Sequence, residues 1–362
     1  MIAEFLLLPA CHPSPVTVYN RVERRVILAR SRNSMERRLM ITIYDSQGGR
    51  LNSRLDDKMV GDSTVWIDIL NPTEDEDGIV ERALNIDVPT RSEMREIEAS
   101  NRFYTENGAS YMTGIVLHNS SVGVPMTSPI TFILAGDRLI TVRYAEPKGF
   151  GLYIARAAKG GNGCSSGAEV MIGLIEMLIE READLIERVQ DEVESMAPLV
   201  FGQKGTEPSR NRRLDVLLRT VGKEGDVVAR AQESAMSLHR LMLFAVNAVR
   251  HHKADPAVIA RYESANQDIT SLMESLRFLS ARTSFLLDAT LGMISTEQNQ
   301  IIKLFSVMAV MLMPPTLVAS IYGMNFKVMP ELEWEYGYPL ALALMFVAAL
   351  IPYLYFRKKG WL

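Results

Sequence analysis

The pattern of hydrophobic and polar positions changes twice along the chain. Up to about residue 147, short β-branched or aromatic runs are bounded by turn residues, which is typical of strands in an α/β domain. From residue 168 onward, apolar residues recur at helical or heptad spacing. Near the end, residues 304–321 and 339–356 contain no charged side chain. Each run is about 18 residues long, close to the thickness of a bilayer's hydrocarbon core, so the pattern predicts two transmembrane helices.

The first part of the chain predicts several short elements. The expected strands are residues 40–44, 65–70, 111–117, 130–134 and 139–142, with a tight hairpin at Gly136-Asp137. Helices are expected at residues 71–84 and 90–98. Residues 160–167 are rich in glycine and serine and lack the preceding strand and the lysine of a phosphate loop, so they predict a flexible linker.

The second part predicts long helices at residues 168–196, 212–250 and 256–321. A helix of about 65 residues measures roughly 100 Å, so the third is expected to leave the soluble domain as a stalk and to continue into the membrane. The fold class is therefore an α+β membrane protein. Its expected parts are a cytoplasmic α/β domain (40–160), a helical region (168–300), a first transmembrane helix (301–322), an external loop (323–338), a second transmembrane helix (339–356) and a basic tail (357–362).

The charges flanking the two apolar runs predict their orientation. A basic cluster follows the second run, whereas the loop between the runs is acidic. The basic residues are Arg357, Lys358 and Lys359, and the loop holds Glu331, Glu333 and Glu335 against Lys327. Since cationic ends stay in the cytoplasm, both termini are expected there, with the protein in the inner membrane and the loop outside. The alternative is two buried core helices of a soluble protein.

Composition excludes several functions. The net charge of −4 argues against binding to nucleic acid. The apolar fraction of 48% fits a protein that is partly soluble and partly in lipid. Carboxylates recur between residues 169 and 194, where we expect a solvated helical face. Cys11 and Cys164 have no metal-ligand spacing, which argues against disulfides, structural zinc and redox chemistry.

The first 39 residues fit poorly with the rest. An arginine-rich stretch at residues 21–38 precedes a strand pattern that opens at the internal Met40. We therefore expect residues 1–39 to be a non-native or disordered leader and translation to start at Met40. A signal peptide is disfavoured because Glu4 precedes the apolar run and Pro9 cuts it short.

One face of the long helix carries small and polar residues. Steps of four and three along the helix connect Asp288, Gly292, Ser295, Asn299, Ile302, Ser306, Ala309, Met313, Thr316, Ser320 and Gly323, which we call the stripe. Small residues alone are often a packing seam between membrane helices. The ionisable, amide and hydroxyl groups of Asp288, Asn299 and Thr316 favour the lining of a pore.

A single helix cannot enclose a pore, so the stripe implies a ring of identical subunits with the second span outside. Asn325 would then stand at the external mouth of every subunit and present neutral amide oxygens. Hard cations such as Mg²⁺ prefer oxygen ligands and lose water reluctantly, so this ring suits a hydrated ion. Glu331, Glu333 and Glu335 would raise the local cation concentration, or they simply solubilise the loop.

At these residues the chain resembles the CorA family of divalent-cation channels. The hallmark Gly323-Met324-Asn325 follows the first of two C-terminal spans. The surrounding residues match as well: Tyr322, Phe326, the run Met329-Pro330-Glu331-Leu332, Trp334, Gly337-Tyr338-Pro339 and Lys358-Lys359-Gly360-Trp361-Leu362. The match is close over residues 288–362, while the earlier part agrees in architecture.

The resemblance implies a homopentameric funnel that carries Mg²⁺, and often Co²⁺ or Ni²⁺, down its gradient. It implies that Gly323, Met324 and Asn325 form the selectivity filter, that Thr316, Met313, Ile302 and Asn299 line the pore, and that Asp288 forms a polar ring at the cytoplasmic mouth. Two features depart from the family: Ile302 and Phe305 stand where leucine or methionine is usual, and Pro314-Pro315 doubles a single proline. The family's regulatory Mg²⁺ pair has no clean counterpart, and the candidates are Glu93, Glu96, Glu263 and Asp268.

Other functions remain open at this point. The nearest is transport of another divalent metal, including Zn²⁺ by a proton-coupled relative, although His118, His239, His251 and His252 lie outside the stripe and a path for soft metals would use His or Cys. A membrane-anchored scaffold without a pore is a different class. An enzyme is disfavoured because no nucleophile motif is recognisable.

Overall fold

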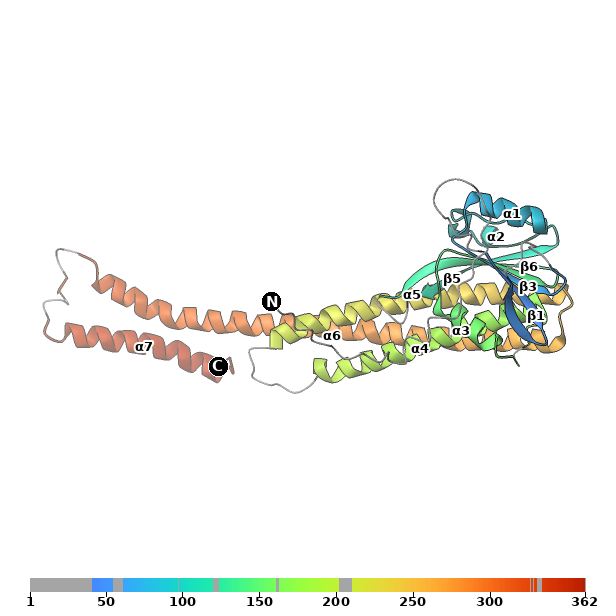
Figure 1. The fold of residues 1–362 in the computed structure, drawn as a ribbon. Coiled ribbons are helices and arrows are strands. Elements are labelled where there is room, and N and C mark those ends of the chain that lie inside the picture. Colours follow the sequence, from blue (N-terminus) through green and yellow to red (C-terminus); the bar gives the residue numbers. More distant parts are fainter. Residues whose placement is uncertain are drawn as a thin grey trace, which may run out of the picture. The chain divides into compact units, whose positions relative to one another are not determined.

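The computed structural model describes residues 41–54, 61–96, 98–119, 124–160, 163–201, 210–325, 327, 329–330 and 334–361. The leader predicted at residues 1–39 lies outside them. Within the described residues, seven strands form one sheet (Figure 1). They are β1 (Ile41–Gln47), β2 (Arg50–Arg54), β3 (Thr64–Leu70), β4 (Phe103–Glu106), β5 (Ala109–His118), β6 (Met126–Ala135) and β7 (Arg138–Arg143).

The strand order is β2-β1-β3-β7-β6-β5-β4, and every pair is antiparallel except β3 with β7. The five strands predicted from the sequence are confirmed, as is the hairpin at Gly136, whose φ is 59°. The sequence did not indicate β2 and β4. The residues of β2 are mostly polar and β4 has four residues, so both depend on pairing with a neighbouring strand for their stability.

Side chains of successive strand residues alternate between two hydrophobic cores. Trp66 and Phe132 belong to a core that they share with residues of the long helices, and Ile67 and Ile133 belong to a core on the opposite face. The second core includes Val80 of α1 (Glu74–Leu84), and Figure 1 shows α1 on that side of the sheet. The sheet is thus covered on both faces, which explains why its central strands are mostly apolar.

The remaining helices are long. They are α3 (Lys148–Ala157), α4 (Gly167–Phe201), α5 (Arg210–His251), α6 (Pro256–Tyr322) and α7 (Gly337–Lys358). The three long helices and the second apolar helix predicted from the sequence are confirmed, and the helix of 67 residues is unbroken. The sequence did not indicate α3, which buries Phe150 and Tyr153 against Trp66. Both α6 and α7 contain an apolar window long enough to cross a membrane, and little of either window is buried.

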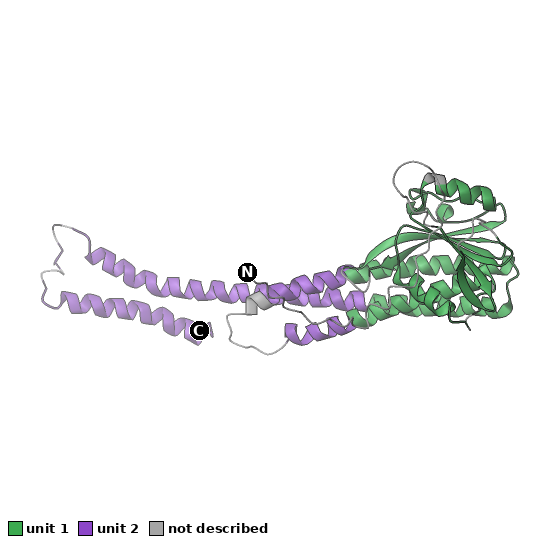
Figure 2. Cartoon of the chain, in the orientation of Figure 1, with its two compact units in different colours: residues 1–189, 227–278 green, residues 190–226, 279–362 purple. Residues whose placement is uncertain are grey.

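The chain divides into two compact units (Figure 2). Unit 1 comprises Met1–Val189 and Val227–Phe278, and unit 2 comprises Gln190–Asp226 and Leu279–Leu362. The sheet and its two cores belong to unit 1. Unit 2 contains the end of α4, the start of α5, the later part of α6, and α7. Within this unit, the ring centroids of Phe201 and Phe285 lie 5.8 Å apart.

Two local predictions are corrected. The helix expected at residues 90–98 is only a single 3₁₀ turn, η2 (Glu93–Arg95), followed by α2 (Ala99–Arg102). The end of the expected flexible linker is held in place, because the Gly167 amide donates to the Asp137 carbonyl at 2.6 Å and the Ser165 amide to Glu169 Oε2 at 2.7 Å. The linker therefore ends as the anchored start of α4.

Candidate functional site

The stripe lies on an exposed face of α6. The pore-lining residues predicted from the sequence are all exposed in the single chain: Asp288, Ser295, Asn299, Ile302, Ser306, Ala309, Met313 and Thr316. Ile302 and Met313 are 61% and 68% exposed although they are large and apolar. Since an unbroken helix turns by about 100° per residue, these positions share one face along the whole of the later part of α6.

The opposite face of α6 is the one that packs. Leu279, Leu286 and Val307 are only 1–2% exposed. By the same helical geometry Leu279 and Leu286 lie roughly half a turn away from the stripe, and Val307 lies about a third of a turn away. In α7, Ala341 and Phe356 are buried among mostly exposed apolar residues. Within unit 2, packing therefore leaves the stripe free.

One contact places the end of α7 beside α6. Lys303 Nζ lies 5.7 Å from the ring centroid of Trp361, which stacks on Phe356 at 5.4 Å. Lys359 Nζ approaches the same Trp361 ring at 5.9 Å. The second apolar helix therefore returns along the 303–307 region of α6.

The backbone around Thr316 affects which oxygen atoms are accessible on the stripe. Its hydroxyl donates to the Leu312 carbonyl at 2.7 Å, which fixes the side chain and leaves the oxygen lone pairs available. Pro314 and Pro315 lie inside α6 and have no amide hydrogen, so the carbonyls four residues earlier lose their usual helical donors. This region of α6 consequently carries more accessible oxygen than an ordinary apolar helix.

The turn after α6 positions the Gly-Met-Asn motif. The Gly323 amide donates to the Ala319 carbonyl at 2.9 Å and the Met324 amide to the Ile321 carbonyl at 3.2 Å. A Cβ at Gly323 would lie 3.1 Å from the Ala319 oxygen, so any larger residue would crowd the turn. Asn325 follows directly and is exposed, as is Glu335, whereas the predicted loop residues Glu331 and Glu333 lie outside the described residues.

The four predicted regulatory carboxylates are not brought together within one chain. Glu93 Oε2 accepts hydrogen bonds from the Thr90 amide and hydroxyl at 2.8 and 2.9 Å, and Glu96 accepts one from Asn101. Glu263, on α6, pairs with Arg250 at 2.5 Å. Asp268 is exposed on the same helix. Across the described residues, no cluster of three or more His, Cys, Asp or Glu side chains is placed to hold a metal ion.

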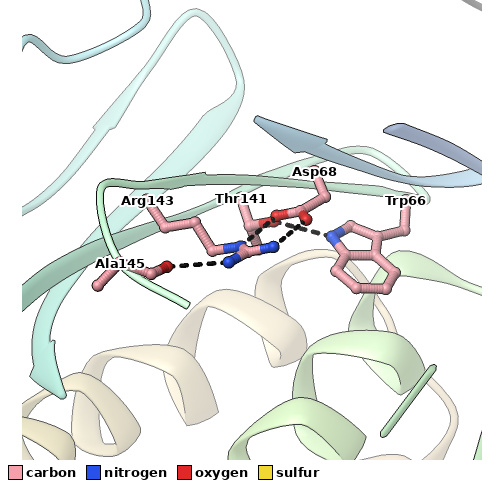
Figure 3. Close-up of polar contacts among 5 residues, drawn as sticks. All are labelled: Trp66, Asp68, Thr141, Arg143 and Ala145. Atoms are coloured by element: carbon pink, nitrogen blue, oxygen red, sulfur yellow. Dashed lines mark hydrogen bonds and ion pairs between the residues drawn. The ribbon is translucent and has the colours of Figure 1, made fainter. Parts of the chain in front are cut away.

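A buried polar network that was not predicted lies where β3 and β7 run parallel (Figure 3). Arg143 donates to both carboxylate oxygens of Asp68 at 2.9 and 2.7 Å, and the Thr141 hydroxyl donates to Asp68 at 2.8 Å. Trp66 Nε1 donates to Thr141 at 2.9 Å, and Arg143 Nη1 donates to the Ala145 carbonyl at 2.9 Å.

The charged and polar groups of this network bond to one another within one chain. Burial alone would lower the pKa of Arg143, but the charge and hydrogen bonds of Asp68 outweigh it and the net shift is upward. Since the network's hydrogen bonds lie within one chain, it fits a structural role. The signal that could have found it is the shared strand parity of Trp66 with Asp68 and of Thr141 with Arg143.

The expectation of a solvated acidic face on α4 is wrong at one position. Glu182 is only 4% exposed, whereas Glu187 and Asp191 on the same helix are exposed. Glu176 is half-buried and accepts from Arg261 at 2.6 Å. The acidic composition of the segment concealed that one of its carboxyls points inward.

Comparisons with known proteins agree over most of the chain. A family model described as CorA-like Mg²⁺ transporter protein matches residues 61–358. The magnesium transport protein CorA of Yersinia pseudotuberculosis is 34% identical over 325 residues, which cover 89% of this chain and 100% of that protein. The protein of the same description from Escherichia coli K12 is 35% identical over 301 residues, covering 83% of this chain and 92% of that protein.

Among solved structures, the CorA magnesium transporter from Methanocaldococcus jannaschii resembles this chain with a TM-score of 0.68. The identity is 16%, and the match covers 89% of this chain and 99% of that one. At this level of identity the likeness speaks for the fold: an α/β domain, a long helix and two C-terminal apolar helices.

Proposed function

The chain belongs to the family of CorA-like Mg²⁺ transporter proteins, and from this premise we propose that it conducts Mg²⁺ passively through a pore lined by one face of α6. Magnesium transport is the activity named for the curated relatives, and it makes the chain a transporter rather than an enzyme. Co²⁺ and Ni²⁺ are further cargo within the proposal, because they too accept oxygen ligands in octahedral geometry.

The observation that carries the proposal is the exposure of the stripe. Ser306 and Thr316 are exposed within the apolar run of residues 304–321, and a polar face there is costly against lipid, since polar groups in the hydrocarbon region need partners. Facing water and ions satisfies them. One helix cannot surround water, so the pore requires a closed ring of identical subunits, which we take to be a pentamer, with α7 on the outer side.

Ion selection is assigned to the turn after α6. Five copies of Asn325 would place neutral amide oxygens around the axis, and these can hydrogen-bond to the water of a hydrated ion without stripping it. Gly323 and Met324 complete the filter by holding the tight turn that presents Asn325. Glu335, together with Glu331 and Glu333, would concentrate cations near this mouth.

The orientation belongs to the proposal as well. Arg357, Lys358 and Lys359 follow α7 directly, and an excess of Lys and Arg is a mark of the cytoplasmic side. Both termini and the α/β domain would then be cytoplasmic, and Asn325 would face outward across the inner membrane.

Regulation by cytoplasmic Mg²⁺ is the last part of the proposal. Glu93, Glu96, Glu263 and Asp268 are exposed, so copies from neighbouring subunits are free to meet. A divalent ion that bridges them would hold the ring closed, and its loss would leave repelling carboxylates. The existing partners of Glu93 and Glu263 would have to yield for this to occur.

Liposomes that contain only this protein test the proposal. Mg²⁺ uptake should follow the Mg²⁺ gradient and should be unaffected by a pH gradient across the membrane. Parallel measurements with Co²⁺, Ni²⁺ and Zn²⁺ rank the ions. Zn²⁺ uptake that depends on a proton gradient, with little Mg²⁺ flux, would favour a proton-coupled zinc carrier instead, and the absence of flux for every ion would favour a scaffold.

A further inference from the structure

Glu182 occupies a position where α4 is otherwise apolar. Its neighbours on the same face, Leu178, Leu185 and Ile186, are at most 6% exposed, and Glu182 itself is 4% exposed. A carboxyl buried among apolar side chains loses its hydration, which disfavours its charged form. Its ionisation state is therefore a property of how unit 1 packs.

A small cavity adjoins this carboxyl. It has about 10 Å³ of space, close to the least that one water molecule needs. Its lining comes from β5, α3, α4 and α5 and includes Val116, Gly149, Leu178, Glu182, Ser234 and Leu238. Two polar atoms there, Glu182 Oε1 and Ser234 Oγ, have no hydrogen-bond partner among the described residues, and Ser234 is 1% exposed.

Two charged groups besides Glu182 line the cavity. Lys148 of α3 and Arg181 of α4 line it, and Arg181 pairs with Asp184 at 2.7 Å. From α5 the cavity receives Ser234, and from β5 it receives apolar side chains. Burial raises the pKa of Glu182 to about 8, and the nearby Ser234 hydroxyl and Ala235 backbone lower it by less, although Ser234 Oγ does not reach ordinary hydrogen-bond geometry.

We propose that Glu182, together with Ser234 and the adjoining cavity, is a proton-binding site that links the packing of α4 on α5 to pH. With its proton bound, the carboxyl is neutral and fits among the apolar side chains of α4. On ionisation the proton passes to water in the cavity and then to solvent, leaving a carboxylate that must draw in water. The packing of α4 on α5 around Ser234 and Leu238 then loosens. This site is independent of the stripe and of the proposed ion path.

Infrared spectroscopy of the full-length protein in lipid tests the site directly. The wild type should show the carbonyl band of a protonated carboxylic acid that disappears as the pH rises through about 8. Glu182→Gln should remove that band. Glu187→Gln, a matched change at an exposed position of the same helix, should leave it unchanged. Absence of such a band from the wild type, or its persistence in Glu182→Gln, would overturn the proposal.

A second variant keeps the test decisive if Glu182→Gln does not fold. Ser234→Ala removes the hydroxyl that lowers the pKa of Glu182, so the midpoint of the band's titration should move to higher pH. A midpoint that stays in place or moves down would mean that the titrating group is not beside Ser234.

Stability gives the linked readout. The pKa of Glu182 is higher in the folded protein than its ordinary value of 4.5, so the folded state binds the extra proton between the two values. Thermal stability should therefore fall as the pH rises from about 4.5 to about 8 and should level off above that. Glu182→Gln should flatten this decline, whereas Glu187→Gln should keep it. An unchanged decline in Glu182→Gln would contradict the linkage.

Discussion

Two polar regions of this molecule are built in opposite ways. In unit 1, Asp68, Thr141 and Arg143 are buried, and each bonds to another residue of the same chain. In unit 2, the polar residues of the stripe lie on an exposed face of α6, opposite the residues that pack. The first region is complete in one chain, and the second presents its polar groups outward.

The difference separates structure from function. A buried ion pair whose partners bond to each other within one chain offers little to a ligand, so its role is to fix the sheet at the junction of β3 and β7. An exposed polar face on a mostly apolar helix has capacity left for partners outside the chain, in water, ions or other copies. For this reason we place transport on the stripe and stability on the network.

The largest expected effect is on transport. Replacing Asn325 with Ala removes the amide oxygen proposed to hold the hydrated ion, so Mg²⁺ flux into liposomes should fall to background while folding and assembly persist. Asn247→Ala removes an exposed amide from α5 and should leave flux intact. Normal Mg²⁺ flux in a folded Asn325→Ala protein would contradict the assignment of Asn325 to the filter.

The next largest effect is on stability. Arg143→Ala leaves the buried carboxylate of Asp68 without its cation, which should cost about 3–5 kcal/mol and lower the melting temperature. Replacing both residues together, as Asp68→Leu with Arg143→Met, should recover much of that loss, because no uncompensated charge remains.

The matched control for that experiment is an exposed pair. Arg219 lies 3.4 Å from Asp215, with the two side chains 80% and 60% exposed. Arg219→Ala should cost no more than about 0.5 kcal/mol. Equal destabilisation by Arg143→Ala and Arg219→Ala would mean that the buried network does not stabilise the sheet.

Adjacent cysteines distinguish exposure to water from exposure to lipid. Leu312 and Met313 are almost equally exposed in the single chain, at 66% and 68%, but only Met313 belongs to the stripe. With Cys11 and Cys164 replaced by Ser, Met313→Cys should react with a water-soluble thiol reagent and lose most of its flux. Leu312→Cys, facing lipid, should not.

The same experiment extends along the helix. Cysteines at Asn299, Ser306 and Thr316 should behave as at Met313, whereas those at Val307 and Val318 should resist labelling. Val307 is 1% exposed on the packed face. Equal labelling of both sets would mean that the stripe does not face the water path.

The smallest expected effect concerns regulation. Neutralising Glu93, Glu96, Glu263 and Asp268 together should raise flux at about millimolar cytoplasmic Mg²⁺, the weak-affinity range of sites with few carboxylates. Neutralising Glu187 and Asp191, exposed carboxylates of α4, is the control. If the inhibition curve for Mg²⁺ does not move in the quadruple variant, the sensor lies at other residues.

Much of this organisation was available from the sequence. The two apolar helices, the 67-residue helix and the stripe follow from residue period and run length, which are local properties of the chain. Strand positions followed from apolar runs bounded by turns, and they failed where the strand was polar or very short, at β2 and β4. The Gly-Met-Asn motif and its place after the first span were sufficient to indicate the family, which the comparisons support.

What only the tertiary structure decided depends on contacts between distant segments. Asp68 and Arg143 are far apart in the sequence and meet because β3 pairs with β7. Glu182 and Glu187 are both glutamates of α4, yet Glu182 is buried beside α5 and Glu187 is exposed to solvent. Local pattern determines which residues share a face of a helix or strand, because backbone geometry sets that period. Which face is covered, and by what, is decided by the packing of elements that the pattern does not connect.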